Sequence, residues 1–410
     1  MKIIKTFFSI LFCLLLVSCT QSMSLEPTKT IHPVATNTKA IPSTKTSIPT
    51  NTPTSIPPTA TLTRMLAPTN TPTQLPIDPG LKLPVRYIED VNVHKLAPQV
   101  ELNQGSVVNA LAFSAEGGLL ASGGDNKIIS VWNLNSQEKL ADLEGHTAAI
   151  KDLAFSPDSE LLISVSFNNQ IKVWETREWS LLYDLEQTSK VIFVKFRSDK
   201  KFLTGNTTGE LIEWNSLTGE ELARFYTPRN QSPSCASSSV LAYDLQSSGS
   251  VFGASLSCGY AVAWKPVGEQ EIEDHVAFNN NQNDGTVQLY TNAIAFSPDW
   301  QYLAFGNFFD YGPYLIGIGN ITSGKFKEGI GASVPNISAM TYSPYGELFL
   351  AGVGSFIRVW PIYSYGAQKS IIDLTNHTSQ ITALEFDNEG EVFASGDYRG
   401  AIIVWGVPEK

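Results

Sequence analysis

The residues best able to do chemistry in this chain are its four cysteines and five histidines. Cys13 and Cys19 lie near the N-terminus, whereas Cys235 and Cys258 lie in the second half of the chain. The histidines are dispersed, at His32, His94, His146, His275 and His377. No pair has the close spacing of metal ligands, and the chain contains no GxSxG, P-loop, HExxH or CxxC motif. We therefore expect no metal site, no cofactor and no enzymatic activity.

The N-terminal segment MKIIKTFFSILFCLLLVSC is typical of a secretory signal. Lys2 and Lys5 precede an apolar run, Phe7 to Val17, that is too short to span a bilayer comfortably. Its end, LVSC, resembles the bacterial lipobox, in which a signal peptidase cuts before a cysteine that carries a diacylglycerol. The resemblance implies a signal peptide over 1–18, lipidation of Cys19 and attachment to the extracytoplasmic face of a bacterial cell membrane. The alternative is an ordinary signal peptide whose cysteines are apolar filler.

The segment that follows, residues 19–84, is rich in Thr and Pro and contains almost no aromatic residues. Such a composition cannot bury a core, and its prolines oppose both helices and sheet ladders. We interpret it as a disordered stalk that holds a folded domain, residues 85–410, away from the membrane.

The charge of the chain restricts what the folded domain can bind. The whole chain has a net charge of −11, but six of its 28 basic and two of its 39 acidic residues precede residue 81. Residues 81–410 therefore carry a net charge of −15. A body this acidic is repelled by nucleic acid and by anionic lipid headgroups, so we expect no nucleic-acid partner and membrane contact only through a lipid anchor.

The domain consists of seven similar units. NALAFSAEGGLLASGGDNKIISVW (109–132), for example, aligns with KDLAFSPDSELLISVSFNNQIKVW (151–174). An apolar anchor recurs every 41 to 51 residues, at Phe113, Phe155, Phe196, Leu245, Phe296, Tyr342 and Phe386. Each unit contains three short alternating runs separated by turns, and a fourth run follows in most of them. This pattern predicts an all-β, seven-bladed propeller whose blades are four-stranded antiparallel sheets.

These units resemble the WD-repeat β-propeller family across residues 93 to 410. The resemblance is carried by GHTAAIKDLAFSPDSELLISVSFNNQIKVW in the second unit, by NHTSQITALEF and SGDYRGAIIVW in the seventh, and by the recurrent strand that ends in Trp. The chain departs from the family pattern because no Trp is followed by Asp and only two units carry the family histidine. The resemblance implies a scaffold that binds protein partners. We expect the protein to be a monomer.

Closure of the ring is expected from the segment VHKLAPQVEL, residues 93–102. Only GVPEK follows Trp405, so the seventh unit lacks its own fourth strand. We predict that 93–102 pairs there as the outermost strand. Pro98 fits this position because an outermost strand can spare a backbone N–H.

In the family, a histidine before the first strand of a blade meets an Asp in the second turn, backed by a Ser or Thr and the Trp. The resemblance assigns this structural network to His146, Ser164, Asn168 and Trp174 in the second unit and to His377 and Trp405 in the seventh.

In the fourth unit, the same comparison puts Cys235 at the histidine place and Cys258 at the Asp place. Once Cys13 is cleaved away and Cys19 is acylated, these are the only thiols left. In an extracytoplasmic compartment, the resemblance therefore implies a disulfide between them. The alternative is two unpaired, buried cysteines acting as small hydrophobic residues.

One segment departs from the repeat in a way that suggests binding. The fifth unit replaces its short second turn with GNFFDYGPYLIG, which places four aromatic residues in a predicted loop on the rim of the disulfide: Phe308, Phe309, Tyr311 and Tyr314. Clustered aromatic residues are typical anchors of protein interfaces. The alternative is that these rings cover the fifth blade or fill the central channel.

Three hypotheses for the function follow. The first is a membrane-anchored extracytoplasmic scaffold that binds a protein partner. The second is a module that binds polysaccharide or cell-wall glycan, for which exposed aromatic rings would stack on sugars. The third, which the absence of catalytic motifs disfavours, is an extracytoplasmic hydrolase that uses carboxylates of the rim.

Overall fold

The computed structural model describes residues 80–89, 91–228, 235–245, 250–266, 272–279, 290–308, 314–332, 337–361 and 372–409. The chain divides into two units, 1–56 and 57–410, and all described residues belong to the second. The predicted signal peptide, Cys19 and nearly all of the predicted stalk lie outside the described residues. No helix in the described part of the chain is long and apolar enough to cross a membrane.

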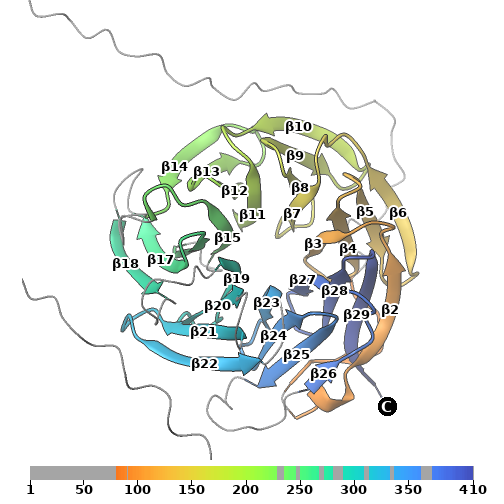
Figure 1. The fold of residues 1–410 in the computed structure, drawn as a ribbon. Coiled ribbons are helices and arrows are strands. Elements are labelled where there is room, and N and C mark those ends of the chain that lie inside the picture. Colours follow the sequence, from red (N-terminus) through yellow and green to blue (C-terminus); the bar gives the residue numbers. More distant parts are fainter. Residues whose placement is uncertain are drawn as a thin grey trace, which may run out of the picture. The chain divides into compact units, whose positions relative to one another are not determined.

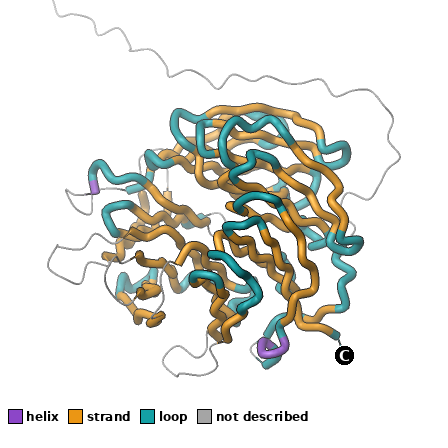
Figure 2. Tube along the Cα trace, turned by 45° about the vertical axis from the view of Figure 1, so that its right-hand side comes forward, coloured by secondary structure: helices purple, strands orange, loops and turns teal. Residues whose placement is uncertain are grey.

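The described chain forms seven antiparallel sheets arranged as blades around a central axis, which confirms the predicted seven-bladed propeller (Figure 1). Nearly all of its regular structure is strand (Figure 2). Within blades one to six, consecutive strands pair in sequence order. The short alternating runs and tight turns of each unit therefore form the antiparallel meander that their period of two predicts.

The strand bounds follow the repeat units closely. Blade one contains β3 (Val108–Phe113), β4 (Leu119–Gly124), β5 (Ile129–Asn133) and β6 (Glu138–Leu143). Blade two contains β7 (Ile150–Phe155), β8 (Leu161–Ser166), β9 (Gln170–Glu175) and β10 (Ser180–Glu186). Blade three contains β11 (Val191–Ser198), β12 (Lys201–Asn206), β13 (Glu210–Asn215) and β14 (Glu221–Tyr226). Blade four contains β15 (Val240–Leu245), β16 (Phe252–Leu256), β17 (Tyr260–Pro266) and β18 (Ile272–Asn279).

The remaining blades complete the ring. Blade five contains β19 (Tyr290–Phe296), β20 (Tyr302–Phe308), β21 (Tyr314–Asn320) and β22 (Phe326–Ala332). Blade six contains β23 (Ile337–Tyr342), β24 (Leu348–Val353), β25 (Phe356–Pro361) and β26 (Ile372–Leu374). Blade seven contains β27 (Ile381–Phe386), β28 (Val392–Asp397) and β29 (Ala401–Pro408), which are joined by β1 (Val85–Arg86) and β2 (Ala97–Asn103) from the start of the domain.

The N-terminal strand closes the ring as predicted. β2 pairs antiparallel with β29, from Ala97 opposite Gly406 to Asn103 opposite Ala401, and the two lie side by side in Figure 1. The ladder is irregular between Pro98 and Val100, where a proline cannot donate a hydrogen bond. The first residues of the predicted strand, 93–96, are not strand, because Val93–Lys95 forms a 3-10 turn, η1.

A short strand that the sequence analysis missed extends this closure. β1 pairs with the last residues of β29, Val85 opposite Pro408 and Arg86 opposite Val407. The chain around it also contacts blade one, because the Leu81 N–H donates to the Glu116 carbonyl at 2.8 Å. Ile88 and Val93 are buried in the cluster between blades six and seven. Residues 80–89 and 91–96, which we call the strap, therefore tie together both sides of the closing blade.

The core consists of seven apolar clusters, one at each interface between adjacent blades. In one of them, Val173 of blade two packs in the same cluster as Val194 and Trp214 of blade three. Burying each such side chain fully contributes roughly 1.5–3 kcal/mol. The blades approach closely enough that a Cβ on Gly123 would lie 2.6 Å from Ile150, and one on Gly396 would lie 2.4 Å from Val108. Glycine at these positions lets neighbouring blades pack in contact.

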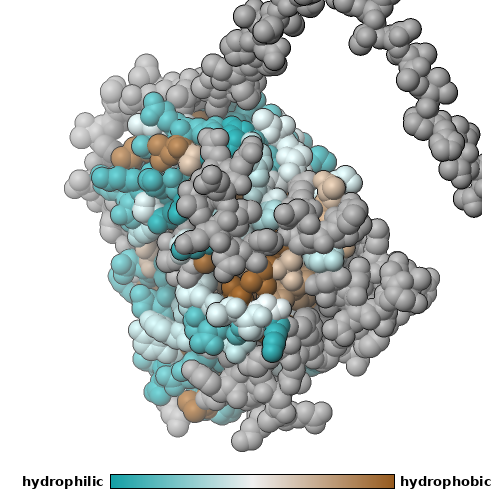
Figure 3. Space-filling model, turned by 90° about the vertical axis from the view of Figure 1, so that its left-hand side faces the viewer, coloured by the Kyte–Doolittle hydropathy of each residue, from teal (hydrophilic) through white to brown (hydrophobic). Residues whose placement is uncertain are grey.

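The outer surface is different in character. Figure 3 views the ring from the side of blade four and shows mainly hydrophilic surface with limited apolar areas among the described residues. The exposed strands are accordingly polar, as in β6, whose sequence EKLADL has only Leu143 fully buried.

Candidate functional site at the upper rim and central channel

The two rims of the ring differ in the connections they carry. We call upper rim the end formed by the turns between the second and third strands and by the connections between blades, which includes Cys258 and His146. The lower rim is the opposite end, where the other two turns of each blade lie. The strap joins the ring at the lower rim, because Asn135 Nδ2, in the β5–β6 turn, donates to the Gly80 carbonyl at 2.7 Å.

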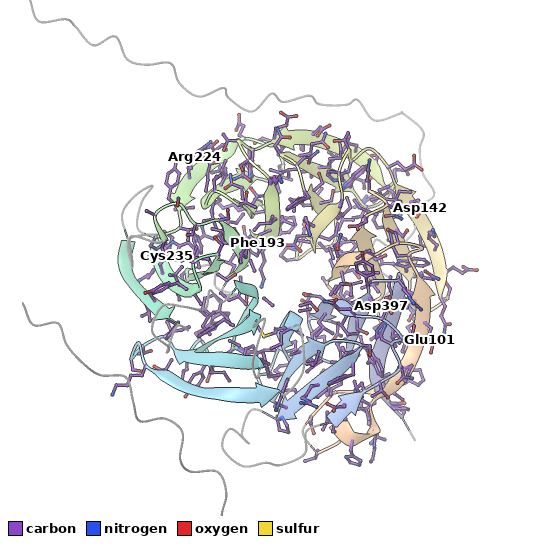
Figure 4. All side chains as sticks on the ribbon, viewed as in Figure 1. Glu101, Asp142, Phe193, Arg224, Cys235 and Asp397 are labelled. Carbon is purple, nitrogen blue, oxygen red and sulfur yellow. A yellow bond between two sulfur atoms is a disulfide. The ribbon has the colours of Figure 1, made fainter. Side chains whose placement is uncertain are left out.

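Blade seven contains the complete hydrogen-bond network at the upper rim (Figure 4 labels Asp397). Trp405 Nε1 donates to Ser395 Oγ at 2.8 Å, and Ser395 Oγ lies 2.6 Å from His377 Nε2. His377 Nδ1 lies 3.0 Å from Asp397 Oδ2. Because a carboxylate only accepts, Nδ1 carries the proton and Nε2 accepts from the serine. Burial lowers the pKa of His377 despite the nearby Asp397, so the ring is neutral.

Blade two contains only part of this network, and the assignment of Asn168 was wrong. His146 Nε2 lies 2.7 Å from Ser164 Oγ, which also accepts from Trp174 Nε1 at 2.8 Å. Asn168 instead bonds Thr147 and Gln170. The reason is positional: Asp397 ends a strand two residues after Ser395, on the same face, whereas Asn168 lies in the turn. The corresponding residue of blade two is Ser166.

Two blades place a glutamine where the family histidine would lie, which the sequence analysis missed. Ser122 Oγ donates to Gln104 Oε1 at 2.5 Å in blade one, and Thr204 Oγ1 donates to Gln187 Oε1 at 3.2 Å in blade three. Both glutamines lie nine residues before the apolar anchor of their unit, as His146 and His377 do. A search by position rather than by residue type could have found them.

In blade four, a disulfide replaces the network (Figure 4 labels Cys235). Cys235 and Cys258 are joined, with their Cα atoms 5.3 Å apart, which confirms the predicted pair. Cys258 lies in the β16–β17 turn and not at the Asp place, which Leu256 at the end of β16 occupies. The bond therefore links the connection before β15 to the second turn, and both cysteines are buried in the core cluster between blades three and four.

Blade four also lacks the hydroxyl that its Trp would use. Ala254 occupies the place of Ser164 and Ser395, ten residues before the Trp. Among the described residues, the buried Trp264 Nε1 has no hydrogen-bond partner. Trp360 Nε1 of blade six is in the same situation, and Leu350 occupies the serine place there.

The central channel contains a set of charged side chains from four blades. The first strands of the blades surround a cavity of about 180 Å³ whose lining includes Asp152 and Glu385. Lys195 Nζ lies 3.1 Å from Asp244 Oδ1. Asp152 Oδ2 accepts the Val194 N–H at 2.8 Å, which ties blade two to blade three.

Lys195 thus interacts electrostatically with three carboxylates, those of Asp244, Glu385 and Asp152. Burial raises the pKa of Asp152 to about 7, although its bonds to the backbone N–H groups of Val194 and Leu153 oppose the shift. The pKa of Glu385 is also raised by burial and by Asp152 and Asp244, against the attraction of Lys195. Burial alone would lower the pKa of Lys195, but Asp244 and Glu385 outweigh it.

The aromatic residues predicted to bind a partner are only partly described. Phe308 and Tyr314 were predicted in a loop, but Phe308 ends β20 and Tyr314 begins β21. Phe309 and Tyr311 lie outside the described residues. Two exposed aromatic residues of the upper rim were missed: Phe167 in the β8–β9 turn, 41% exposed, and Tyr398 in the β28–β29 turn, 61% exposed.

Within the described residues, no three His, Cys, Asp or Glu side chains are grouped so that they could hold a metal ion. What the described upper rim and channel offer is hydrogen bonding, charge and exposed aromatic surface on a rigid ring. These features are suited to the recognition of a binding partner.

Comparison with known families agrees with this architecture. The family model of the WD domain, G-beta repeat, matches residues 98–133, 137–175 and 368–406. Each match begins on or shortly before the outermost strand of one blade and ends on the third strand of the next, and together they cover the networks of blades one, two and seven. No curated protein matches the chain. The chain therefore contains WD40 repeats, and the other four blades are seen in the structure.

The disulfide should contribute substantially to stability. It closes a loop with a sequence separation of 23, for which the chain-entropy relation gives about 3 kcal/mol. We expect the double variant Cys235→Ser, Cys258→Ser to lose about this free energy of unfolding in a denaturant titration. A protein beginning at Gly80 contains only these two cysteines, so thiol counting on denatured, unreduced protein should find none. Two reactive thiols would contradict the bond.

Supplying the missing hydroxyl in blade four should stabilise the protein. Ala254→Ser is expected to place Oγ beside Trp264 Nε1, as in the four blades with a Ser or Thr, and to gain about 1 kcal/mol. The matched control is Leu350→Ser in blade six, which should be destabilising because it removes a buried side chain. If Ala254→Ser left the free energy of unfolding unchanged or lower, the unpaired indole N–H of Trp264 would not destabilise the protein.

The channel carboxylates should make stability depend on pH. The folded-state pKa of Asp152, about 7, lies above its unfolded value near 4, so its stabilising protonation is complete below pH 4 and lost as pH rises through 7. The buried neutral histidines make the unfolding free energy rise with pH in the acid range. The test therefore compares wild type and variant at each pH. We expect Asp152→Asn to flatten the decline in unfolding free energy between pH 5.5 and pH 8. Parallel curves for both proteins would contradict this.

Proposed function

We propose that this WD40-repeat propeller is a non-enzymatic scaffold, held by a lipid on Cys19 at the extracytoplasmic face of a bacterial membrane, whose upper rim binds a protein partner. WD40 propellers commonly bind protein partners, and a seven-bladed ring with closed edges is a rigid support for such a surface.

The observation that carries this proposal is where the chain enters the ring. The strap begins at Gly80 against the lower-rim turns of blade one, through the Glu116 carbonyl and Asn135. A tether joined to Gly80 therefore leaves from the lower rim. The upper rim, with the disulfide and the exposed aromatic side chains, is the end of the ring opposite Gly80, and this is the end that we assign to a partner.

Two further observations support the compartment. A disulfide between buried cysteines persists in oxidising surroundings and is rare in reducing ones. The acidic body, at −15, is repelled by anionic headgroups, so a lipid on the N-terminus is the contact with the membrane that its charge permits.

Glycan binding is the second candidate, and exposed tyrosines favour it. Tyr345 on the lower rim is 64% exposed and packs edge-on against Tyr87, with ring centroids 6.2 Å apart. Flat exposed rings of this kind could stack on sugars. These tyrosines lie at the rim where the tether enters, and for this reason we prefer the protein partner.

One experiment tests both parts of the scaffold proposal. Wild type and Cys19→Ala are expressed with a labelled fatty acid, and proteins are then captured from solubilised membranes by the purified domain. We expect label and membrane retention only in wild type, together with a captured protein that Phe167→Ala or Tyr398→Ala reduces and Tyr345→Ala does not. Unchanged membrane attachment of Cys19→Ala would refute the anchor. Retention on immobilised cell-wall glycan without any captured protein would favour the second candidate.

A further inference from the structure

An exposed aromatic ring on the upper rim is flanked by two lysines. Phe167 lies in the turn between β8 and β9, and Lys151 Nζ and Lys190 Nζ lie 5.0 and 4.5 Å from the centre of its ring. Lys151 belongs to β7, and Lys190 lies just before β11, so blades two and three both contribute. A cation over an aromatic face is attracted to it, but at an exposed site only weakly. The ring therefore orients the ammonium groups without neutralising them.

Neither lysine is neutralised by an acidic side chain. Among the described residues, no Asp or Glu forms an ion pair with Lys151 or Lys190. Burial lowers the pKa of Lys151, and Asp125 opposes this shift. The Oδ1 of Asp125 already accepts from Asn109 Nδ2 at 2.8 Å. Most other described lysines and arginines on blades one to three lie in ion pairs. Two unpaired cations side by side are thus unusual in this acidic body.

The position of Lys151 differs from its counterparts in other blades. The first strand of most blades has an irregularity at this point, and there the polar side chain usually ties one blade to the next. Asn109 Nδ2 donates to the Ile150 carbonyl at 3.1 Å, and Thr382 Oγ1 donates to the Val108 carbonyl at 2.5 Å. In blade two the neighbouring Asp152 makes the tie to blade three. Lys151 itself makes no such tie, and its side chain lies at the upper rim beside Phe167.

The backbone holds this arrangement in place. The Phe167 N–H donates to the Ala149 carbonyl at 2.8 Å, and the Val191 N–H donates to the Asn168 carbonyl at 2.7 Å. The Lys190 carbonyl in turn accepts the Thr207 N–H at 3.0 Å. The turn that presents the ring and the segment that presents Lys190 are therefore fixed to each other before any ligand binds, which lowers the entropic cost of recognition.

We propose that Phe167, Lys151 and Lys190 form a binding site for a short acidic peptide segment of the protein partner, a proposal that rests on the scaffold function above. The lysines would pair with two carboxylates, and the exposed edge of the ring would pack against the apolar part of the segment.

The charge distribution favours a short segment over a larger polyanion. A membrane surface or a nucleic acid interacts with the whole body, whose charge of −15 repels it. A segment of a few residues lies within about a Debye length, roughly 10 Å, of the two lysines and responds chiefly to their local field. An apolar ring without a hydroxyl also suits a peptide better than a sugar acid.

The test uses fluorescence anisotropy of a labelled octaglutamate peptide with the whole domain, residues 80–410. We expect binding that weakens as salt is raised, and a loss of about tenfold in the variant Lys151→Met, Lys190→Met, since each exposed pair is worth a few-fold. Phe167→Leu should weaken binding by a smaller factor. The matched control is Lys200→Met, an exposed lysine in the lower-rim turn between β11 and β12, which should bind as wild type does.

Several results would overturn the proposal. They are the absence of peptide binding, equal losses in Lys200→Met and in the double variant, or tighter binding of octagalacturonate than of octaglutamate. Thermal unfolding of each variant establishes that the ring is intact. If the double variant still captured the membrane protein that wild type captures, the scaffold function would stand and only this assignment of its site would fall.

Discussion

Closure of the ring depends on one backbone ladder, between β2 at the start of the domain and β29 at its end. Blades one to six are each built from one continuous stretch of chain, but blade seven is not, because β1 and β2 come from the start of the domain. Without β2, a row of N–H and C=O groups on β29 would be unpaired. The apolar cluster that joins blade seven to blade one would also lose Val100 and Leu102.

The strap reinforces this closure from the lower rim. Residues 80–89 and 91–96 contact blade one, run along the last residues of β29 and contribute Ile88 and Val93 to the interface of blades six and seven. The first described residues therefore contact the blades on both sides of blade seven. A force applied at the N-terminus would act on all of these contacts. A domain carried on an N-terminal tether benefits from this arrangement, because force is spread over three blades instead of acting on one strand.

At the upper rim, different side chains occupy equivalent positions. The partner of the Ser or Thr hydroxyl is histidine in blades two and seven and glutamine in blades one and three. In blade four a disulfide links the corresponding connections. Each alternative holds the connection between blades against the end of the second strand. What the fold requires is a link of the right length, and the chemistry that provides it can vary.

The channel and the rim show how charge is divided in an acidic protein. In the channel, Lys195 pairs with Asp244 and is also attracted by Asp152 and Glu385, and backbone N–H groups donate to Asp152. On the rim of blades two and three, Lys151 and Lys190 lie against an apolar ring without an acidic partner. These two positive charges are opposite in sign to the net charge of the domain, so an acidic ligand would be attracted to this small area of the surface.

The sequence by itself determined the architecture. The period of 41 to 51 residues, the alternating runs and the terminal Trp were sufficient to predict seven four-stranded blades, because strand alternation and turn chemistry are local properties. It also indicated that a strand before the first unit closes the ring, since VHKLAPQVEL resembles the fourth run of the first unit, QEKLADLEGH. The cysteine pair followed from the family resemblance and from counting the remaining thiols.

Only the tertiary structure decided which side chains meet. Asn168 lies at a plausible distance from Trp174 in sequence, yet the network needs a residue at the end of the strand, on the face of the serine, and that residue is Ser166. Gln104 and Gln187 were not recognised because a resemblance compares residue types, whereas a hydrogen bond needs only an acceptor in the right place. The strap, the channel charges and the lysines beside Phe167 join residues that are far apart in sequence or on different blades. Their meeting is set by the packing of blade on blade, which no local pattern encodes.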